Sequence, residues 1–266
     1  EVYDANDLSK KPFRMNADPM EITRFYWATN DKIIFSARQV VRKKIDGFND
    51  GVYKTTSGIL TLNKDPKKSK WVKLRELGRG GLRGPIIGKP NKFLIYSYDK
   101  GSFSPKYYEY DVISKKRTLI TRESENIRNF SFDGFGNPQF ARGYSGSSDE
   151  YITYYRNKET SSWDVINRMH RENFESWRAY GIDPLSPEDL LVVAHNGANT
   201  AGLWSFDPKK NEYKELIYRR ADGDVFPVFH SNEYQNPDLI TGLTYYEGRL
   251  SLIHISEPTR RRGISY

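Results

Sequence analysis

The chain has 266 residues, of which 37% are hydrophobic and 14% aromatic, and it carries a formal net charge of +8. The absence of Cys excludes disulfides, thiolate metal sites and a cysteine nucleophile. No apolar run approaches the roughly 18 residues that a membrane-spanning helix requires. The hydrophobic residues are enough to build a core, and the many aromatic residues suit the half-buried faces of β-sheets.

The first 74 residues predict a series of strands separated by polar turns. Residues 1–15 have the pattern of the outer hairpin of a sheet. The next four strands are predicted, in chain order, at residues 22–28, 32–41, 51–62 and 70–74. These four strands would make one complete antiparallel unit.

A glycine-rich stretch, GRGGLRG, follows at residues 78–84. A phosphate-binding loop of this kind needs a strand before it and a helix after it, whereas Pro85 and a strand-like apolar pair follow here. We therefore interpret the stretch as a connector between units. A second unit is expected from residue 86 to 123, with strands in KFLIYSY at 92–98 and in the hairpin YYEYDVISKKRTLITR at 107–122.

The next two units are predicted at residues 127–171 and 177–220, and a further one opens at 224–246. The segment GYSGS at 143–147 differs from a nucleophile elbow because Ser147 occupies the place of the last Gly and another strand follows. We interpret it as a turn.

Three histidines are candidate bases or metal ligands. His195 lies beside the predicted Asn-Gly hairpin turn at 196–197, with no acidic residue or second His at a useful sequence spacing. It is interpreted as a structural or loop histidine, and His170 and His230 are interpreted in the same way.

A polar-turn hairpin recurs along the chain, and its spacing predicts the fold. The residues that enter these turns are 61, 46, 46 and 50 positions apart, and they are Asp4, Asp65, Asp111, Asn157 and Asp207. A period close to that of a propeller blade predicts an all-β fold. We expect an incomplete β-propeller of four-stranded antiparallel blades, with about four whole blades and partial blades at both ends.

The C-terminal segment LSLIHISEPTR at 250–260 resembles the translation of a transposase-type sequencing-library adapter. We therefore expect a partial propeller domain at 1–249 and an artefactual tail, not a domain, at 250–266. His254 and the arginines at 260–262 would then carry no function. A basic nucleic-acid-binding tail is the alternative.

Four stretches resemble the propeller of bacterial prolyl oligopeptidase family serine peptidases, of the dipeptidyl or acylaminoacyl peptidase-like kind. They are EITRFYWATNDKIIFSARQVVRKKIDG from Glu21, NFSFDGFGNPQFARGY from Asn129, LLVVAHNGANTAGLWSFDP from Leu190 and ELIYRRADGDV from Glu215. The resemblance covers residues 1 to about 249. It implies an N-terminal propeller, commonly seven-bladed, that caps a C-terminal α/β-hydrolase domain bearing the catalytic Ser, Asp and His. No catalytic residue is therefore assigned to this sequence, which is expected to be inactive alone.

The resemblance also implies a role in gating and selecting peptide substrates for the hydrolase domain, its partner in cis. Arg38 and Arg42, in the extended basic segment of the first whole unit, could contact a peptide carboxylate or carbonyl; a solvated basic loop is the alternative. The paired-Glu amine clamp of some dipeptidyl peptidases is not evident in the sequence. No cofactor or metal is expected. The absence of Cys permits export and slightly favours a periplasmic or extracellular location over a cytoplasmic one, but it does not assign a compartment.

A stand-alone β-propeller that binds or scaffolds protein partners is the alternative function. Nucleic-acid binding is not expected, because Lys and Arg are spread over turns and do not cluster with aromatic residues on one element.

Overall fold

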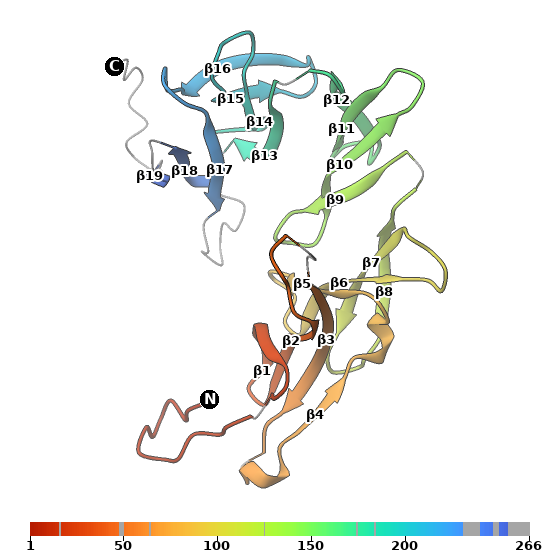
Figure 1. The fold of residues 1–266 in the computed structure, drawn as a ribbon, viewed down its shortest axis with the longest axis vertical. Coiled ribbons are helices and arrows are strands. Elements are labelled where there is room, and N and C mark those ends of the chain that lie inside the picture. The colour runs from red at the N-terminus through yellow and green to blue at the C-terminus, as the bar shows by residue number, and fades with distance from the viewer. Residues whose placement is uncertain are drawn as a thin grey trace. The chain divides into compact units, whose positions relative to one another are not determined.

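The computed structural model describes residues 1–15, 17–47, 51–63, 65–124, 126–173, 175–183, 185–230, 240–246 and 250–254. These residues form antiparallel β-sheets in which strands adjacent along the chain are adjacent in the sheet (Figure 1). Single turns of 3₁₀ helix occur at η1 (Pro66–Lys68) and η2 (Arg75–Leu77). The all-β fold expected from the repeat is confirmed.

The chain divides into two compact units, Glu1–Arg122 and Glu123–Tyr266. The first unit holds two four-stranded sheets. The strands of the first sheet are, in spatial order, β1 (Glu21–Thr29), β2 (Lys32–Arg42), β3 (Val52–Thr61) and β4 (Lys70–Lys73). Those of the second sheet are β5 (Gly81–Pro85), β6 (Lys92–Tyr98), β7 (Pro105–Asp111) and β8 (Arg117–Arg122).

The second unit holds two four-stranded sheets and one three-stranded sheet. The third sheet consists of β9 (Arg128–Phe132), β10 (Pro138–Ser145), β11 (Glu150–Arg156) and β12 (Trp163–His170). The fourth consists of β13 (Trp177–Asp183), β14 (Ser186–Ala194), β15 (Gly202–Asp207) and β16 (Glu212–Tyr218). The fifth consists of β17 (Val225–His230), β18 (Ile240–Tyr246) and β19 (Leu250–His254).

Three core clusters of the described residues lie between the faces of consecutive sheets within a unit, and a fourth lies between the first sheet and the N-terminal segment. In β14, Leu190 and Val192 join a buried cluster with residues of the third sheet, whereas Leu191 and Val193 join one with residues of the fifth. A strand buried on both faces needs apolar side chains at every position, because successive side chains point to opposite faces. This is why residues 190–194 of β14 form a continuous apolar run.

The repeated hairpins share one turn chemistry. In each, the side-chain oxygen of the turn-entry residue accepts a hydrogen bond from a backbone N–H two residues on, which is the Asx-turn arrangement. The donor–acceptor distances are 2.8 to 3.1 Å, and the acceptors are Asp4, Asp65, Asp111, Asn157 and Asp207. The turn-entry residues identified in the sequence therefore occupy equivalent positions in their turns.

The expected connector over the glycine-rich stretch is wrong in part, because residues 81–85 form strand β5. The strand runs close to β6: a Cβ on Gly80 would collide with the backbone of Tyr96, and one on Gly81 would lie 3.0 Å from the Tyr96 ring. Close approach of the Tyr96 backbone requires glycine at position 80, and the Tyr96 ring crowds position 81.

The N-terminal segment and Leu250–His254 both make β-type backbone pairings. Near the N-terminus, Val2 and Phe13 exchange backbone hydrogen bonds of 2.9 Å, closing a hairpin by a single bridge. At the other end, Leu250–His254 pairs with β18 as strand β19. These five residues fall in the segment interpreted as an adapter-derived tail; their pairing does not bear on its origin, and residues 255–266 lie outside the described residues.

Candidate functional site

The predicted substrate-contact residues, Arg38 and Arg42, lie on a two-stranded projection from the first sheet. Pairing with β1 ends at Arg38 and pairing with β4 ends at Gly58, whereas β2 and β3 remain paired to Arg42 and Val52. We call the described residues 39–47 and 51–55 the β2–β3 arm. The structure thus places Arg38 at the base of the arm and Arg42 farther out.

Arg38 is held in place by its neighbours. Its Nε donates to Glu21 Oε2 at 2.8 Å, and its guanidinium carbon lies 5.4 Å from the centroid of the Tyr53 ring. The hydrogen bond to Glu21, together with the charge of that carboxylate, raises the pKa of Arg38. A guanidinium already committed to a carboxylate and a ring has fewer free donors for a ligand.

Arg42 differs from Arg38 in its surroundings. The side chain is exposed and makes no hydrogen bond or ion pair within the part of the chain that the structure describes. All its donors therefore remain available to a ligand.

The β2–β3 arm combines positive charge with exposed apolar side chains. Arg42, Lys43, Lys44 and Lys54 supply the charge. The exposed apolar residues of the arm are Val40, Val41, Ile45, Val52 and Tyr53. Exposed apolar surface rimmed by polar groups is typical of a surface that contacts another molecule.

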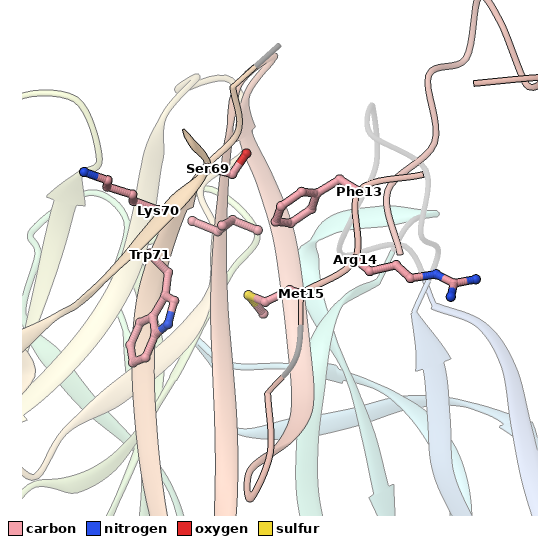
Figure 2. A pocket seen from close by; sticks show the side chains of 7 residues that line it. Phe13, Arg14, Met15, Ser69, Lys70 and Trp71 are labelled. Carbon is pink, nitrogen blue, oxygen red and sulfur yellow. The ribbon is translucent and has the colours of Figure 1, made fainter. Parts of the chain in front are cut away.

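A surface groove lies between the N-terminal segment and the outer strands of the first sheet. Figure 2 shows Phe13 and Met15 pointing toward Ser69, Lys70 and Trp71 at the start of β4, and Arg14 pointing away. The groove has a volume of about 490 Å³, within the range of small-ligand sites. Its lining includes no acidic residue or histidine, so its composition suits apolar contact and not acid–base catalysis.

A further feature, not identified from the sequence, is an arginine on the first strand of every four-stranded sheet. These residues are Arg24, Arg83, Arg128 and Arg178. In the first unit, Arg24 donates to the Arg83 carbonyl at 3.1 Å. In the second unit, Arg128 is the direct cross-strand partner of Arg142 on β10. The strand order shows that each of these arginines lies on the first strand of its sheet, although at different places along it.

Arg142 and Arg178 influence one another electrostatically. Burial lowers the pKa of Arg142, and the positive charge of Arg178 lowers it further. The Arg178 guanidinium carbon lies 5.2 Å from the centroid of the Tyr180 ring. The pair therefore places two like charges near a partly buried phenol.

His195 has an acidic neighbour, contrary to the expectation from sequence spacing. Its Nε2 lies 3.6 Å from Asp224 Oδ1, and its Nδ1 accepts a hydrogen bond of 2.8 Å from the Ser176 backbone N–H. Asp224 also accepts from the Ala201 backbone N–H at 2.7 Å. These contacts tie together strand ends that are distant in sequence, which is why the spacing did not reveal the acid.

The other residues considered as possible catalytic groups or ligands are two histidines and the GYSGS segment. His170 Nδ1 accepts from the Glu172 backbone N–H at 3.3 Å, and the side chain of His230 lies outside the described residues. Of the GYSGS segment at 143–147, residues 143–145 end strand β10 and residues 146–147 begin the turn to β11, so the predicted turn is confirmed only for its last two residues. Within the described ranges, no group of three or more His, Cys, Asp or Glu is placed to hold a metal ion, and no helix is long and apolar enough to cross a membrane.

Comparison with known proteins gives a fold but no family. No protein-family description and no curated protein matches the chain. Among solved structures, a prolyl endopeptidase superposes with a TM-score of 0.50 at 9% identity, over 85% of this chain and 32% of that one. Dipeptidyl peptidase 4 from Porphyromonas gingivalis gives 0.46 at 12% identity, over 83% and 33%. The propeller domain of the Pyrococcus furiosus Trilobed protease gives 0.40 at 11% identity, over 88% and 81%.

The chain thus spans about a third of the length of the first two structures that it matches. At such low identity the likeness concerns architecture alone. Together with the four-stranded antiparallel sheets, it identifies the fold as that of β-propeller blades.

Proposed function

We propose that this chain is the propeller portion of a serine peptidase of the prolyl oligopeptidase family, and that it gates and helps to select peptides for a following α/β-hydrolase domain. The observation that carries the proposal is the run of four-stranded blades with the architecture of a prolyl endopeptidase. Propellers serve many functions, so the fold supports the role without establishing it.

Within this role, Arg42 is the better of the two predicted peptide contacts. Arg38 is already bound to Glu21, whereas the donors of Arg42 are open to a peptide carboxylate or carbonyl. We therefore expect Arg42→Gln to weaken the binding of an unstructured peptide more than Arg38→Gln does. The matched control is Lys73→Gln, an exposed basic residue of β4 outside the β2–β3 arm.

The decisive test is the uninterrupted gene from the same source. Sequence continuing from residue 249 should replace the adapter-like tail with a strand, a Gly-x-Ser-x-Gly motif and a helix, followed by Asp and then His. The 266-residue chain should leave peptide anilides intact, while the longer product hydrolyses them. Hydrolysis that survives repurification and follows the 266-residue chain would contradict the proposal.

The second candidate function is a stand-alone propeller that binds protein partners. The β2–β3 arm favours this second function, because it presents exposed apolar and basic side chains beyond the ends of β1 and β4. A reading frame that ends after one or two further blades, with no hydrolase motif, would favour this function over the first.

A further inference from the structure

The β2–β3 arm extends beyond the strands that flank its base. The ladder between β1 and β2 ends at Arg38, and the ladder between β4 and β3 ends at Gly58. Farther out, β2 and β3 pair with each other. A Cβ on Gly51 would lie 3.0 Å from the Lys44 backbone nitrogen, so the two chains are still side by side at that point. The arm is therefore a two-stranded projection that another surface can approach.

The apolar side chains of the arm lie in water. Four aliphatic residues and one tyrosine are each 41% to 63% exposed, namely Val40, Val41, Ile45, Val52 and Tyr53. Removing such side chains from water is favourable in proportion to the apolar area that is covered. A group of exposed apolar residues bordered by charged ones is typical of a surface that contacts a partner or a membrane.

The arm is also strongly basic. Its exposed cations are Arg42, Lys43, Lys44 and Lys54. Within the described residues, only Lys44 has an acidic neighbour, Asp46 at 3.2 Å. Charges of one sign on so short a segment attract a surface of the opposite sign.

The residue types on the arm favour a lipid surface over a protein. Protein interfaces are enriched in Arg and depleted in Lys, whereas three of the four cations on the arm are Lys. A Lys side chain can cover apolar surface with its methylene groups while its ammonium group stays at the polar headgroups. Apolar residues beside Lys and Arg are typical of segments that bind anionic membranes.

We propose that the β2–β3 arm binds the surface of an anionic lipid bilayer, with its aliphatic side chains among the headgroups and its basic side chains against their negative charges. Beyond Arg38 and Gly58, each strand of the arm has one edge outside the ladders with β1 and β4. Unpaired backbone groups cannot enter hydrocarbon, so the arm would stay in the headgroup region. Membrane attachment of this kind is separate from peptide selection and does not rest on the proposed function.

The test is flotation of the 266-residue chain with vesicles of phosphatidylcholine alone, and with vesicles of phosphatidylcholine and phosphatidylserine in a three-to-one mixture. Each Lys or Arg near an anionic surface strengthens binding about fivefold. The chain should therefore bind the mixed vesicles at least about tenfold more tightly than the neutral ones. Lys43→Gln should weaken binding to the mixed vesicles about fivefold. Val41→Ser should have a similar effect, because partial burial of a valine contributes a comparable amount.

The matched controls are Lys73→Gln and Val72→Ser on β4, outside the arm. Lys73→Gln removes the same charge as Lys43→Gln, and Val72 is 61% exposed against 63% for Val41. Neither control should change binding more than about twofold, because salt screens charges that lie more than about 10 Å from the membrane. Circular dichroism checks that every variant is folded.

Contact of the arm with the bilayer is measured separately with a fluorescent label. The chain has no Cys, so Val41→Cys provides a single attachment point for an environment-sensitive dye. The emission of this dye should shift to the blue on the mixed vesicles, whereas the same dye on Val72→Cys should not change.

Four outcomes would overturn the proposal. Equal affinity for both kinds of vesicle would show that anionic lipid is not recognised. Equal losses in the arm and β4 variants would mean that general charge, and not the arm, is responsible. An unchanged emission at position 41 on bound chain would place the arm away from the bilayer. Binding to soluble polyglutamate that depends on Lys43 and Val41, without binding to vesicles, would assign the arm to an acidic protein instead.

Discussion

At the residue scale, the second unit contains a buried carboxylate held by a hydroxyl. Asp183 is 1% exposed, and its Oδ2 accepts from Ser205 Oγ at 2.7 Å. Its Oδ1 accepts from the Leu185 backbone N–H at 3.0 Å. A buried carboxylate needs such donors, because removing one leaves part of its desolvation uncompensated.

Ser205→Ala should therefore lower the free energy of unfolding of the second unit by about 2 kcal/mol, the cost expected for a lost hydrogen bond to a charged group. The measurement is native-state hydrogen exchange in β14 and β15. A loss no larger than that of an exposed serine would show that Asp183 does not depend on the hydroxyl.

Ser36→Ala in the first unit is the matched control. Ser36 Oγ lies 3.0 Å from Ser57 Oγ, also buried, but the bond joins two neutral hydroxyls. We expect a smaller cost, about 1 kcal/mol.

Sequence analysis was least successful in predicting which individual side chains lie close together. Arg142 and Arg178 belong to different sheets, and no motif links them in the sequence. The acid beside His195 was missed for the same reason, since Asp224 follows a further pair of strands. Sites assembled from several strands depend on packing, which local patterns do not encode.

At the element scale, the recurring hairpin is the unit that the sequence does encode. Asp111 accepts hydrogen bonds of 2.8 Å from the backbone N–H groups of both Ile113 and Ser114. Lys115 then takes a left-handed conformation with φ of 58°. The side chain substitutes for a missing backbone partner and fixes the turn.

Asp111→Ala should destabilise the β7–β8 hairpin by about 1 kcal/mol, because both N–H groups lose their acceptor. Asp111→Asn keeps a side-chain oxygen at the same place and should cost less. Hydrogen exchange of the amides of β8 reports the difference. Equal costs for the two substitutions would contradict this account of the turn.

The same hairpin should be sensitive to acid. The backbone hydrogen bond from Ser114, with further help from Ile113 and Lys92, lowers the pKa of Asp111 below its ordinary value. A carboxyl group with a lowered pKa contributes stability above the unfolded-state value of about 3.9, and that contribution is lost as pH falls through the folded-state pKa. Asp111→Asn should flatten this part of the pH dependence of hairpin stability. Asp46→Asn, on the exposed β2–β3 arm, is the control and should leave it unchanged.

Strand positions were predicted well where alternation or a continuous apolar run was strong. The segment 92–98 is β6 as expected, and the apolar run 190–194 lies within β14. Strand β5 was not predicted at residues 81–85, because glycine has no side chain that could contribute to an alternating hydrophobic pattern. The contact with Tyr96 explains why glycine stands there. Local periodicity therefore predicted the fold, but it did not predict where the chain approaches a neighbouring strand closely.

At the scale of the whole molecule, the core clusters that contain buried residues of β2, β6 and β14 each lie within one of the two compact units. The buried residues of β6 belong to the first unit, and those of β14 to the second. Stability can therefore differ between the units, since local unfolding follows the packing that it disrupts.

Ile95→Ala removes a fully buried side chain of β6 and should cost about 3 kcal/mol. We expect amide protection to fall throughout residues 21–122 and to stay unchanged in residues 126–220. Val192→Ala in β14 is the mirror experiment and should reverse the pattern. An equal fall of protection in both units after either substitution would show that they unfold together.

The turn-entry residues carry one more consequence. Asp111 and Asp207 both have a lowered pKa, chiefly through backbone N–H donors. Asn157 holds the equivalent turn between β11 and β12 through an amide oxygen, with bonds of 2.9 and 3.1 Å. An amide gains no proton in the range where these carboxylates do. On acidification, the blades should therefore loosen in a set order, and the third blade should keep its outer hairpin after its neighbours have released theirs.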